Sequence, residues 1–201
     1  MNQQNTTSRR RDPEARTREI LDAATAIVKQ EGTAELTHRA VAARSGLALG
    51  TVTKYFPAID ILREQTLIRL SDEIDAELDK LEPTLLQIDT EPEKVARAIY
   101  DYLLDRHQVR ADLTLMVAGA YETDLRHLAL RWTNRMTDIL ACRIGRKRAT
   151  ALAIFFDGMT VTSALSDLPV NLQLIADTIL AVLGMGNATG QIIGNRDESP
   201  A

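Results

Sequence analysis

Apolar residues recur every three or four positions along most of the chain, which is the period of an amphipathic α-helix. The first such face consists of Ile20, Leu21, Ala24, Ile27 and Val28. Asp12 and Pro13 predict the start of this helix, because an Asp side chain caps free backbone amides and proline suits the first helical position. Gly32 predicts its end.

Further helical patterns follow as far as residue 183. We expect helices over about 37–45, 48–55, 58–83, 92–103, 110–120, 125–140, 151–165 and 172–183. Pro83 is expected to end the longest of them. No segment shows the alternation of a strand, and the ten Gly and six Pro lie mostly between the helical segments. The pattern predicts an all-α protein with about nine helices.

The segment 37–56, THRAVAARSGLALGTVTKYF, has the spacing of a helix-turn-helix. Its two short helices must cross closely, so the first needs a small residue, the turn a glycine, and the second a branched apolar residue. Ala42, Gly46 and Val52 meet these needs. In a chain this rich in alanine the spacing also arises by chance, so it indicates DNA binding without establishing it.

Residues 12–62 resemble the DNA-binding domain of the TetR family of transcriptional regulators. Its members have a long first helix ending near a glycine, here ILDAATAIVKQEG, and a threonine opening the second helix. The family signature A-G-V-S-x-G-x-L-Y-x-[YH]-F is matched by SGLALGTVTKYF, outright at Gly46, Gly50, Tyr55 and Phe56. Side chains that relatives often use for capping or phosphate contact are missing at Ala48, Leu49, Thr53 and Ile59.

The resemblance implies a three-helix DNA-binding domain followed by a helical bundle that binds a ligand and dimerises. We expect a flexible basic arm over 1–11, the helix-turn-helix domain over 12–57, the bundle over 58–186 and a flexible tail over 187–201. The implied function is a ligand-responsive regulator, more often a repressor in this family. It would bind a near-palindromic operator in double-stranded DNA as a homodimer and be released by a small-molecule inducer.

The expected DNA contacts lie on the second and third helices, at Thr37, His38, Leu49, Gly50, Thr51, Thr53, Lys54 and Tyr55. The first two begin a helix, and helix N-termini bind phosphate. Gly50 lets the backbone approach the duplex, and the residues at 49, 51 and 53 face the groove. Tyr55 and Lys54 resemble phosphate contacts, although the Tyr55 ring can also pack on the helix beneath it.

The charge distribution adds a modest argument for DNA. The chain has a net charge of -4, but residues 1–56 hold nine Lys and Arg against six Asp and Glu. A mildly basic head on an acidic body permits phosphate contact by the head alone, although such a small excess is equally typical of solvated surface. The three arginines of residues 9–11 either compensate for the missing phosphate contacts or form a solvated tail.

In the body, two sets of apolar residues carry the implied ligand and dimer functions. Relatives form an inducer cavity between the helices that here carry Tyr102, Met116, Tyr121, Trp132, Met136 and Phe155, each of which also suits an ordinary core. The last two helices have more apolar surface than one body can cover, so they are either central or packed against a second copy. The expected dimer interface is Leu152, Phe155, Phe156, Met159, Leu172, Ile175, Ile179 and Val182.

Other functions have little support in the sequence. The three histidines lack metal-ligand spacing, Cys142 is the only cysteine, and no phosphate loop, nucleophile elbow or carboxylate pair appears, so we expect no catalytic residue, metal or cofactor. Apolar runs are too short to span a membrane, and without a recognisable leader we expect a cytoplasmic protein. The alternatives are a TetR-like protein without ligand response that acts through a protein partner and, less favoured, a small helical enzyme.

Overall fold

The computed structural model describes residues 12–166 and 170–186, and the arm and tail expected at the two ends lie outside them. This part of the chain contains two short 3-10 helices, Thr33–Glu35 and Thr123–Leu125, and no strand. Its nine α-helices are α1 (Pro13–Glu31), α2 (His38–Ser45), α3 (Leu49–Tyr55), α4 (Ile59–Leu85), α5 (Pro92–Leu104), α6 (Arg106–Tyr121), α7 (Arg126–Ile144), α8 (Arg146–Leu165) and α9 (Leu172–Leu183). The all-α prediction is confirmed. None of the helices described is both long and apolar enough to cross a membrane.

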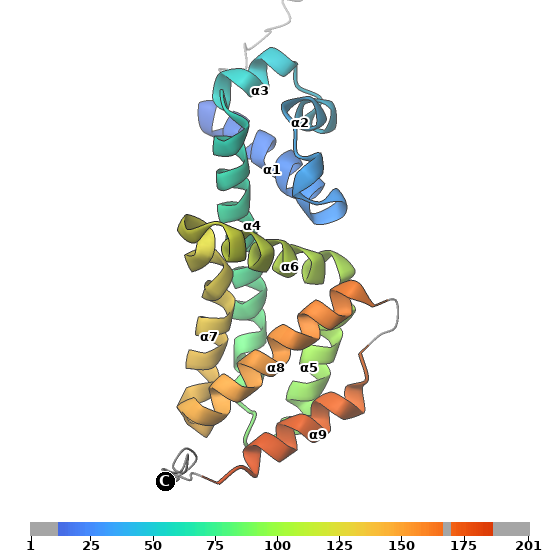
Figure 1. Cartoon of the computed structure of the whole chain (residues 1–201), viewed down its shortest axis with the longest axis vertical. Coiled ribbons are helices and arrows are strands. Elements are labelled where there is room, and N and C mark those ends of the chain that lie inside the picture. The colour runs from blue at the N-terminus through green and yellow to red at the C-terminus, as the bar shows by residue number, and fades with distance from the viewer. Residues whose placement is uncertain (1–11, 167–169, 187–201) are drawn as a thin grey trace, which may run out of the picture.

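The helices form a head and a body joined by α4 (Figure 1). Helices α1, α2 and α3 gather at one end of the molecule, and α4 runs from them into the body, while α8 and α9 cross the opposite end. Local chemistry explains the boundaries of α1, because the Asp12 side chain accepts a hydrogen bond from the Glu14 amide at 3.0 Å and Gly32 stops the helix with a φ of 92°. Both ends were predicted correctly.

Helix boundaries differ from the prediction in several places. Helix α6 starts at Arg106, because Asp105 caps it by accepting hydrogen bonds from the amides of residues 107 and 108. Helix α8 starts at Arg146, directly after Gly145, which has a φ of 79°. Helix α4 continues through Pro83 to Leu85. Residue 79, whose carbonyl loses its helical partner at this proline, is exposed to solvent, so the loss is tolerated near the helix end.

Two hydrophobic cores fill the molecule, and α4 contributes to both. The first core joins α1, α2 and α3 to the first part of α4, where Leu67 and Leu70 are fully buried, and extends to α6 and α7. The second core joins the later part of α4, from Leu78 onward, to α5, α7, α8 and α9. Trp132 on α7 packs against both. The head is therefore continuous with the body through buried apolar contacts.

Gly46 and Gly50 offer a matched test of the turn. Gly46 ends α2 with a φ of 70°, where a side chain costs about 1–2 kcal/mol, whereas Gly50 lies in α3 with open space around a Cβ position. Gly46→Ala should therefore lower the free energy of unfolding by about 1 kcal/mol, and Gly50→Ala should leave it unchanged or raise it by up to about 1 kcal/mol. Urea unfolding of both variants checks this, and an equal loss in both would contradict the assigned turn.

Candidate nucleic-acid interface and ligand cavity

Helices α2 and α3 form the crossing that the sequence spacing predicted. Ala42, Val41 and Val52 are buried between them and α1, and Gly46 makes the left-handed turn. The Thr37 side chain caps α2 by accepting a hydrogen bond from the Ala40 amide at 3.1 Å. Ala48 occupies the capping position of α3 without a side-chain bond. The hydrophobic contacts thus hold a recognition helix whose own N-terminus lacks a side-chain cap.

The outward face of α3 is formed by residues at helical spacing. Leu49, Gly50 and Lys54 are exposed and Thr53 is half-buried, and these positions share one face of the helix. Thr51 and Tyr55 lie beside this face and are half-buried, and Tyr55 packs against the first core. The structure therefore brings the predicted α3 residues onto one surface, with the Tyr55 ring also serving the packing role that we had left open.

His38 has a structural contact that the sequence did not predict. Its Nε2 lies 2.7 Å from the carbonyl oxygen of Phe56. A carbonyl can only accept, so Nε2 carries the proton and donates it. The side chain thereby ties the start of α2 to the end of α3, where the Phe56 ring is buried in the core. The side chain is thus engaged within the head, and the backbone amide of residue 38 remains at the N-terminus of α2.

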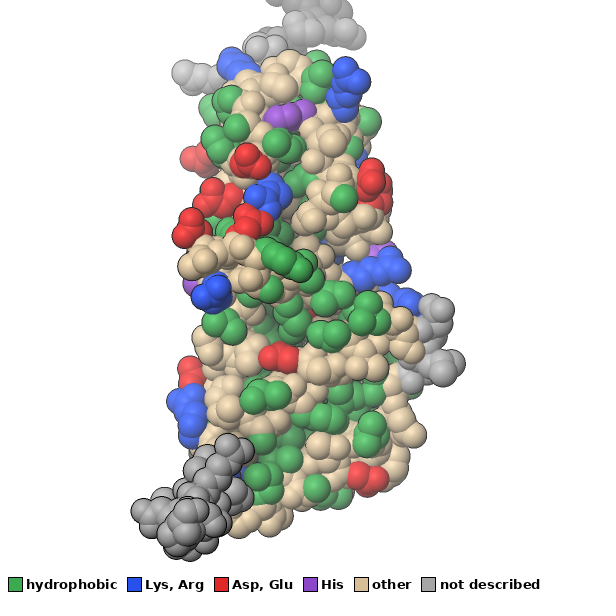
Figure 2. Space-filling model, in the orientation of Figure 1, with side chains coloured by type: hydrophobic (Ala, Val, Ile, Leu, Met, Phe, Trp, Pro, Cys, Tyr) green, Lys and Arg blue, Asp and Glu red, His purple; other side chains and the backbone are tan. Residues whose placement is uncertain are grey.

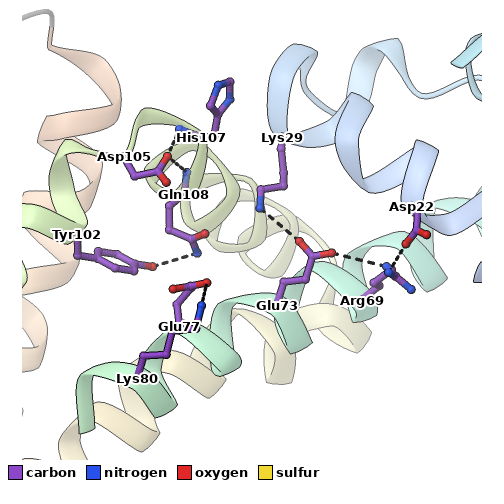
Figure 3. Close-up of polar contacts among 10 residues, drawn as sticks. All are labelled: Asp22, Lys29, Arg69, Glu73, Glu77, Lys80, Tyr102, Asp105, His107 and Gln108. Atoms are coloured by element: carbon purple, nitrogen blue, oxygen red, sulfur yellow. Dashed lines mark hydrogen bonds and ion pairs between the residues drawn. The ribbon is translucent and has the colours of Figure 1, made fainter. Parts of the chain in front are cut away.

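Charged side chains connect the head to the body along the junction with α4 (Figure 3). Asp22 on α1 pairs with Arg69 on α4, and Lys29 on α1 lies 3.3 Å from a Glu73 oxygen on α4. Arg69 Nε also lies 3.6 Å from Glu73. The exposed faces of α1 and α4 are thus joined by a chain of alternating charges, each pair of which is worth at most about 1 kcal/mol at such a surface.

A second connection joins the start of α4 to the segment after α6. Arg63 donates two hydrogen bonds to the Glu122 carboxylate, one of them 2.8 Å long between Nη2 and Oε2. This contact to the Arg63 guanidinium holds the pKa of Glu122 below its usual value. The bidentate geometry fixes the end of α6 against the head.

A small cavity lies in the body between α4, α6, α7 and α8. Its volume is about 10 Å³, room for about one water molecule. The lining residues are Ser71, Ile74, Asp75, Asp112, Leu115, Met116, Leu128, Ala129, Trp132 and Thr160. Two of the six predicted ligand residues, Met116 and Trp132, therefore line the cavity, and a larger molecule can enter only if the surrounding helices move.

Tyr102 closes one side of this region. Its ring stacks on Trp132 with centroids 5.0 Å apart, and its hydroxyl donates a hydrogen bond to Asp112 at 2.7 Å. Gln108 Nε2 donates to the same hydroxyl at 3.2 Å. On its other side Tyr102 borders a surface hollow of about 520 Å³ that also reaches Glu77 and Lys80. Figure 3 shows Tyr102 and Gln108 facing each other across from these two residues of α4.

The two aspartates that line the cavity differ in their charge partners. Asp75 on α4 pairs with Arg131 and lies 3.3 Å from Arg135, both on α7. Asp112 on α6 is 7% exposed, makes no ion pair within the described residues, and its Oδ1 has no hydrogen-bond partner there. Burial raises the pKa of Asp112 to about 7, with a smaller contribution from repulsion by Asp157.

The remaining predicted ligand residues do not line the cavity. Tyr121 is 87% exposed and borders a separate surface hollow near Arg63 and Glu122. Met136 is fully buried in the second core, and the Phe155 ring packs against Phe156.

The sequence analysis did not single out Asp112, which lines the cavity, although the sequence contains a signal for it. Asp112 occupies the buried stripe of α6, where helical periodicity otherwise places apolar side chains.

The predicted dimer residues divide into two sets. Within one chain five of them are already buried in the second core, which corrects the expectation that they face a second copy: Leu152, Phe156, Met159, Ile175 and Ile179. Phe155, Leu172 and Val182 are half-buried. The exposed apolar residues of this pair of helices are instead Ile154, Leu165, Leu174 and Leu180. Figure 2 shows apolar side chains with few charges over α8 and α9.

Gly158 also lies on the exposed side of α8. A Cβ at this position would meet no atom of the described part of the chain within 4 Å. Leu152, Ala153, Phe156 and Met159 face inward instead. Helix α8 is thus apolar on two faces. One face packs against the body, and the other is open to solvent in the single chain.

The geometry defines a helix-turn-helix protein whose head is carried by a helical body. The family model described as "Bacterial regulatory proteins, tetR family" matches residues 20–65. Residues 20–65 therefore form a DNA-binding domain of the type found in TetR-family transcriptional regulators, and members of this family are not enzymes. Comparison with curated protein sequences finds no match.

Solved structures support the same fold over nearly the whole chain. A TetR-family member from Streptomyces coelicolor is 27% identical with a TM-score of 0.72, covering 85% of this chain and 99% of its own. The multidrug binding protein EbrR in complex with imidazole is 28% identical with a TM-score of 0.71, covering 92% of this chain and 100% of its own. Its ethidium complex is 27% identical with a TM-score of 0.69, covering 85% and 99% respectively.

The pKa of Asp112 generates a prediction for stability. A folded-state pKa of about 7, against an ordinary value of 3.8, means that the folded protein retains a proton that the unfolded chain loses as the pH rises between these values. Asp112 therefore destabilises the fold increasingly as the pH rises from about 4 to about 7, and the full penalty remains above pH 7. Asp112→Asn retains an acceptor for Tyr102 and should raise the free energy of unfolding at pH 8 by up to about 4 kcal/mol.

Urea unfolding at pH 5 and pH 8 measures this effect. The gain from Asp112→Asn should be clearly smaller at pH 5, whereas Asp138→Asn, a change at an exposed carboxylate on α7, should show no comparable difference. A pH-independent gain, or a loss of stability at pH 8, would contradict the raised pKa.

Proposed function

We propose that this protein is a ligand-responsive transcriptional regulator that binds a near-palindromic operator as a homodimer and is released by a small-molecule inducer, and so acts as a repressor. The observation that carries the proposal is the exposed face of α3 on a helix-turn-helix that the family model matches. Residues 12–57 serve DNA binding in this proposal, and residues 58–186 serve ligand binding and dimerisation.

The DNA contacts we propose follow from the exposed positions of the head. Leu49, Gly50 and Thr53 face the major groove, with Thr51 at the edge of the same surface. Lys54 and Tyr55 contact phosphates, together with the N-terminus of α2 that Thr37 caps. Figure 2 shows Lys and Arg side chains at both edges of the outer end of the head, where the duplex would lie.

The dimer is supported by the exposed apolar surface of α8 and α9. Ile154 and Leu165 on α8, and Leu174 and Leu180 on α9, leave an apolar surface that a second copy would cover. Gly158 on the same side permits close approach of another helix. A two-fold dimer would present two recognition helices, as a near-palindromic operator requires.

Ligand response is supported by the cavity between the helices of the body and by one relative. EbrR is described as a multidrug binding protein and has been solved with ethidium. In this chain Trp132 and Met116 line the cavity, and Tyr102 stacks on Trp132, so the cavity has aromatic and apolar surface beside it. The alternative, a TetR-like protein that acts through a protein partner without a ligand, lacks a comparable observation.

The roles of two α3 residues can be separated by mutation. Thr51→Ala should relax the preferred base at one position of each half-site by about 1 kcal/mol, because a groove contact is lost. Tyr55→Phe should weaken all sequences about equally, since the ring stays packed and only a phosphate contact is removed. Selection from a random DNA pool, followed by affinity measurements on the selected and altered sites, distinguishes the two. Equal changes in base preference would contradict the assigned roles.

The dimer surface can be tested with two exposed apolar residues of similar type. Ile154→Glu places a charge on the proposed interface, so sedimentation should show monomers and operator affinity should fall at least tenfold. The matched control is Leu130→Glu on α7, where the leucine is 47% exposed and lies outside α8 and α9. A dimer that survives Ile154→Glu, or is lost equally in both variants, would exclude this interface.

A further inference from the structure

The cavity of the body has an unusual balance of charge. Among the described residues that line it are two carboxylates, Asp75 and Asp112, and no Lys, Arg or His. Arg131 and Arg135 approach Asp75 from α7 and compensate its charge. No cationic side chain of residues 12–166 or 170–186 forms an ion pair with Asp112, which is more than nine-tenths buried and whose acceptor Oδ1 has no hydrogen-bond partner among these residues. A buried carboxylate of this kind is matched by a cation or remains costly.

The described residues around Asp112 do not supply that cation. Tyr102 and Gln108 reach it as neutral hydrogen-bonding groups. Asp157 on α8 adds further negative charge and is itself held by the Thr133 hydroxyl. Lys29 on α1 attracts Asp112 only weakly and lies beside Glu73. Every element packed around Asp112 therefore leaves the site electronegative or neutral.

Aromatic surface lies next to the same carboxylate. The rings of Tyr102 and Trp132 are stacked with an interplanar angle of 21°, and the Tyr102 hydroxyl donates a hydrogen bond to Asp112. Flat aromatic rings beside a carboxylate favour delocalised cations, which gain both cation–π attraction and charge pairing. A neutral or anionic ligand would gain from the rings alone and would meet the unpaired oxygen without compensating it.

Tyr102 also lies between the cavity and the outside. The hollow of about 520 Å³ on its other face is bordered by Glu77, Asp101 and Asp105, and by Lys29 and Lys80. Carboxylates thus outnumber amines at the approach as well. A ligand in this hollow would reach Asp112 once Tyr102 and Gln108 swing aside, which also provides the space that the closed cavity lacks.

We propose that the body binds a flat aromatic organic cation, with the Asp112 carboxylate as its counter-ion and Tyr102 and Trp132 as its aromatic contacts. The ligand enters beside Tyr102 and takes the place of the Tyr102 hydroxyl at Asp112. This inference rests on the proposed ligand response and specifies its chemistry. Its site is the buried cavity and not the outer hollow, which serves as the approach.

Three compounds of similar shape and different charge test the proposal. They are the 1-methylquinolinium cation, its neutral isostere 1-methylnaphthalene, and the anion 1-naphthoate. Trp132 is the only tryptophan of the chain, so quenching of its fluorescence reports binding at this cavity. At pH 8 the cation should bind at least tenfold more tightly than either of the other compounds.

Asp112→Asn is the decisive variant, because it retains the shape of the side chain and removes its charge. It should weaken binding of 1-methylquinolinium at least tenfold and leave 1-methylnaphthalene unchanged, whereas Asp138→Asn should change neither. Urea unfolding of each variant serves as the control that it is folded. Equal binding of the cation by the wild type and Asp112→Asn, tighter binding of the neutral or anionic compound, or no binding of the cation would overturn the proposal.

Operator binding is measured separately with the DNA sequence selected from the random pool. If the cation binds through Asp112 but leaves DNA affinity unchanged, the cation site is supported and the proposed ligand response fails. If the neutral or anionic compound releases DNA and the cation does not, ligand response is supported and the cation site is overturned. The two proposals can therefore fail independently.

Discussion

Helix α4 belongs to both hydrophobic cores, and this shared burial determines how the head is held on the body. Leu67 and Leu70 are buried with α1, and Leu78 and Leu85 are buried with the body, all on one continuous helix. A helix of 27 residues is about 40 Å long, so it acts as a stiff connection. The exposed ion pairs of Asp22, Lys29 and Glu73 add orientation, but each contributes far less than a buried leucine.

The head was the part of the structure most open to prediction from sequence. Its boundaries depend on local chemistry, such as the Asp12 cap and the left-handed Gly46, and its buried positions follow the spacing of Ala42 and Val52. The His38 contact to Phe56 joins residues 18 positions apart, so no local pattern could indicate it. The direction of the His38 side chain therefore could not be predicted without the tertiary structure.

In the body, helices were predicted well but their faces were not. Helix α8 is apolar on both sides, so periodicity could not tell the inward Phe156 from the outward Ile154. The expected ligand residues were chosen by side-chain type, which selected Met136, a residue buried in the second core, and passed over Asp112, which lines the cavity. An acid at an apolar position of the α6 pattern was the better signal for a cavity residue, because burying a carboxylate costs free energy that an apolar side chain at the same position would not.

Helix α6 both lines the cavity and packs against the head. Asp112 lies between Ala111 and Leu115, which are both part of the core shared with α1, α2 and α3. The end of the same helix is tied to the start of α4 by Arg63 and Glu122. The ligand that we propose would separate Tyr102 from Asp112 and so would act on a helix whose neighbouring side chains pack against the head. Because a packed core tolerates little displacement without rearranging, movement of α6 at the cavity would change the packing that orients α1.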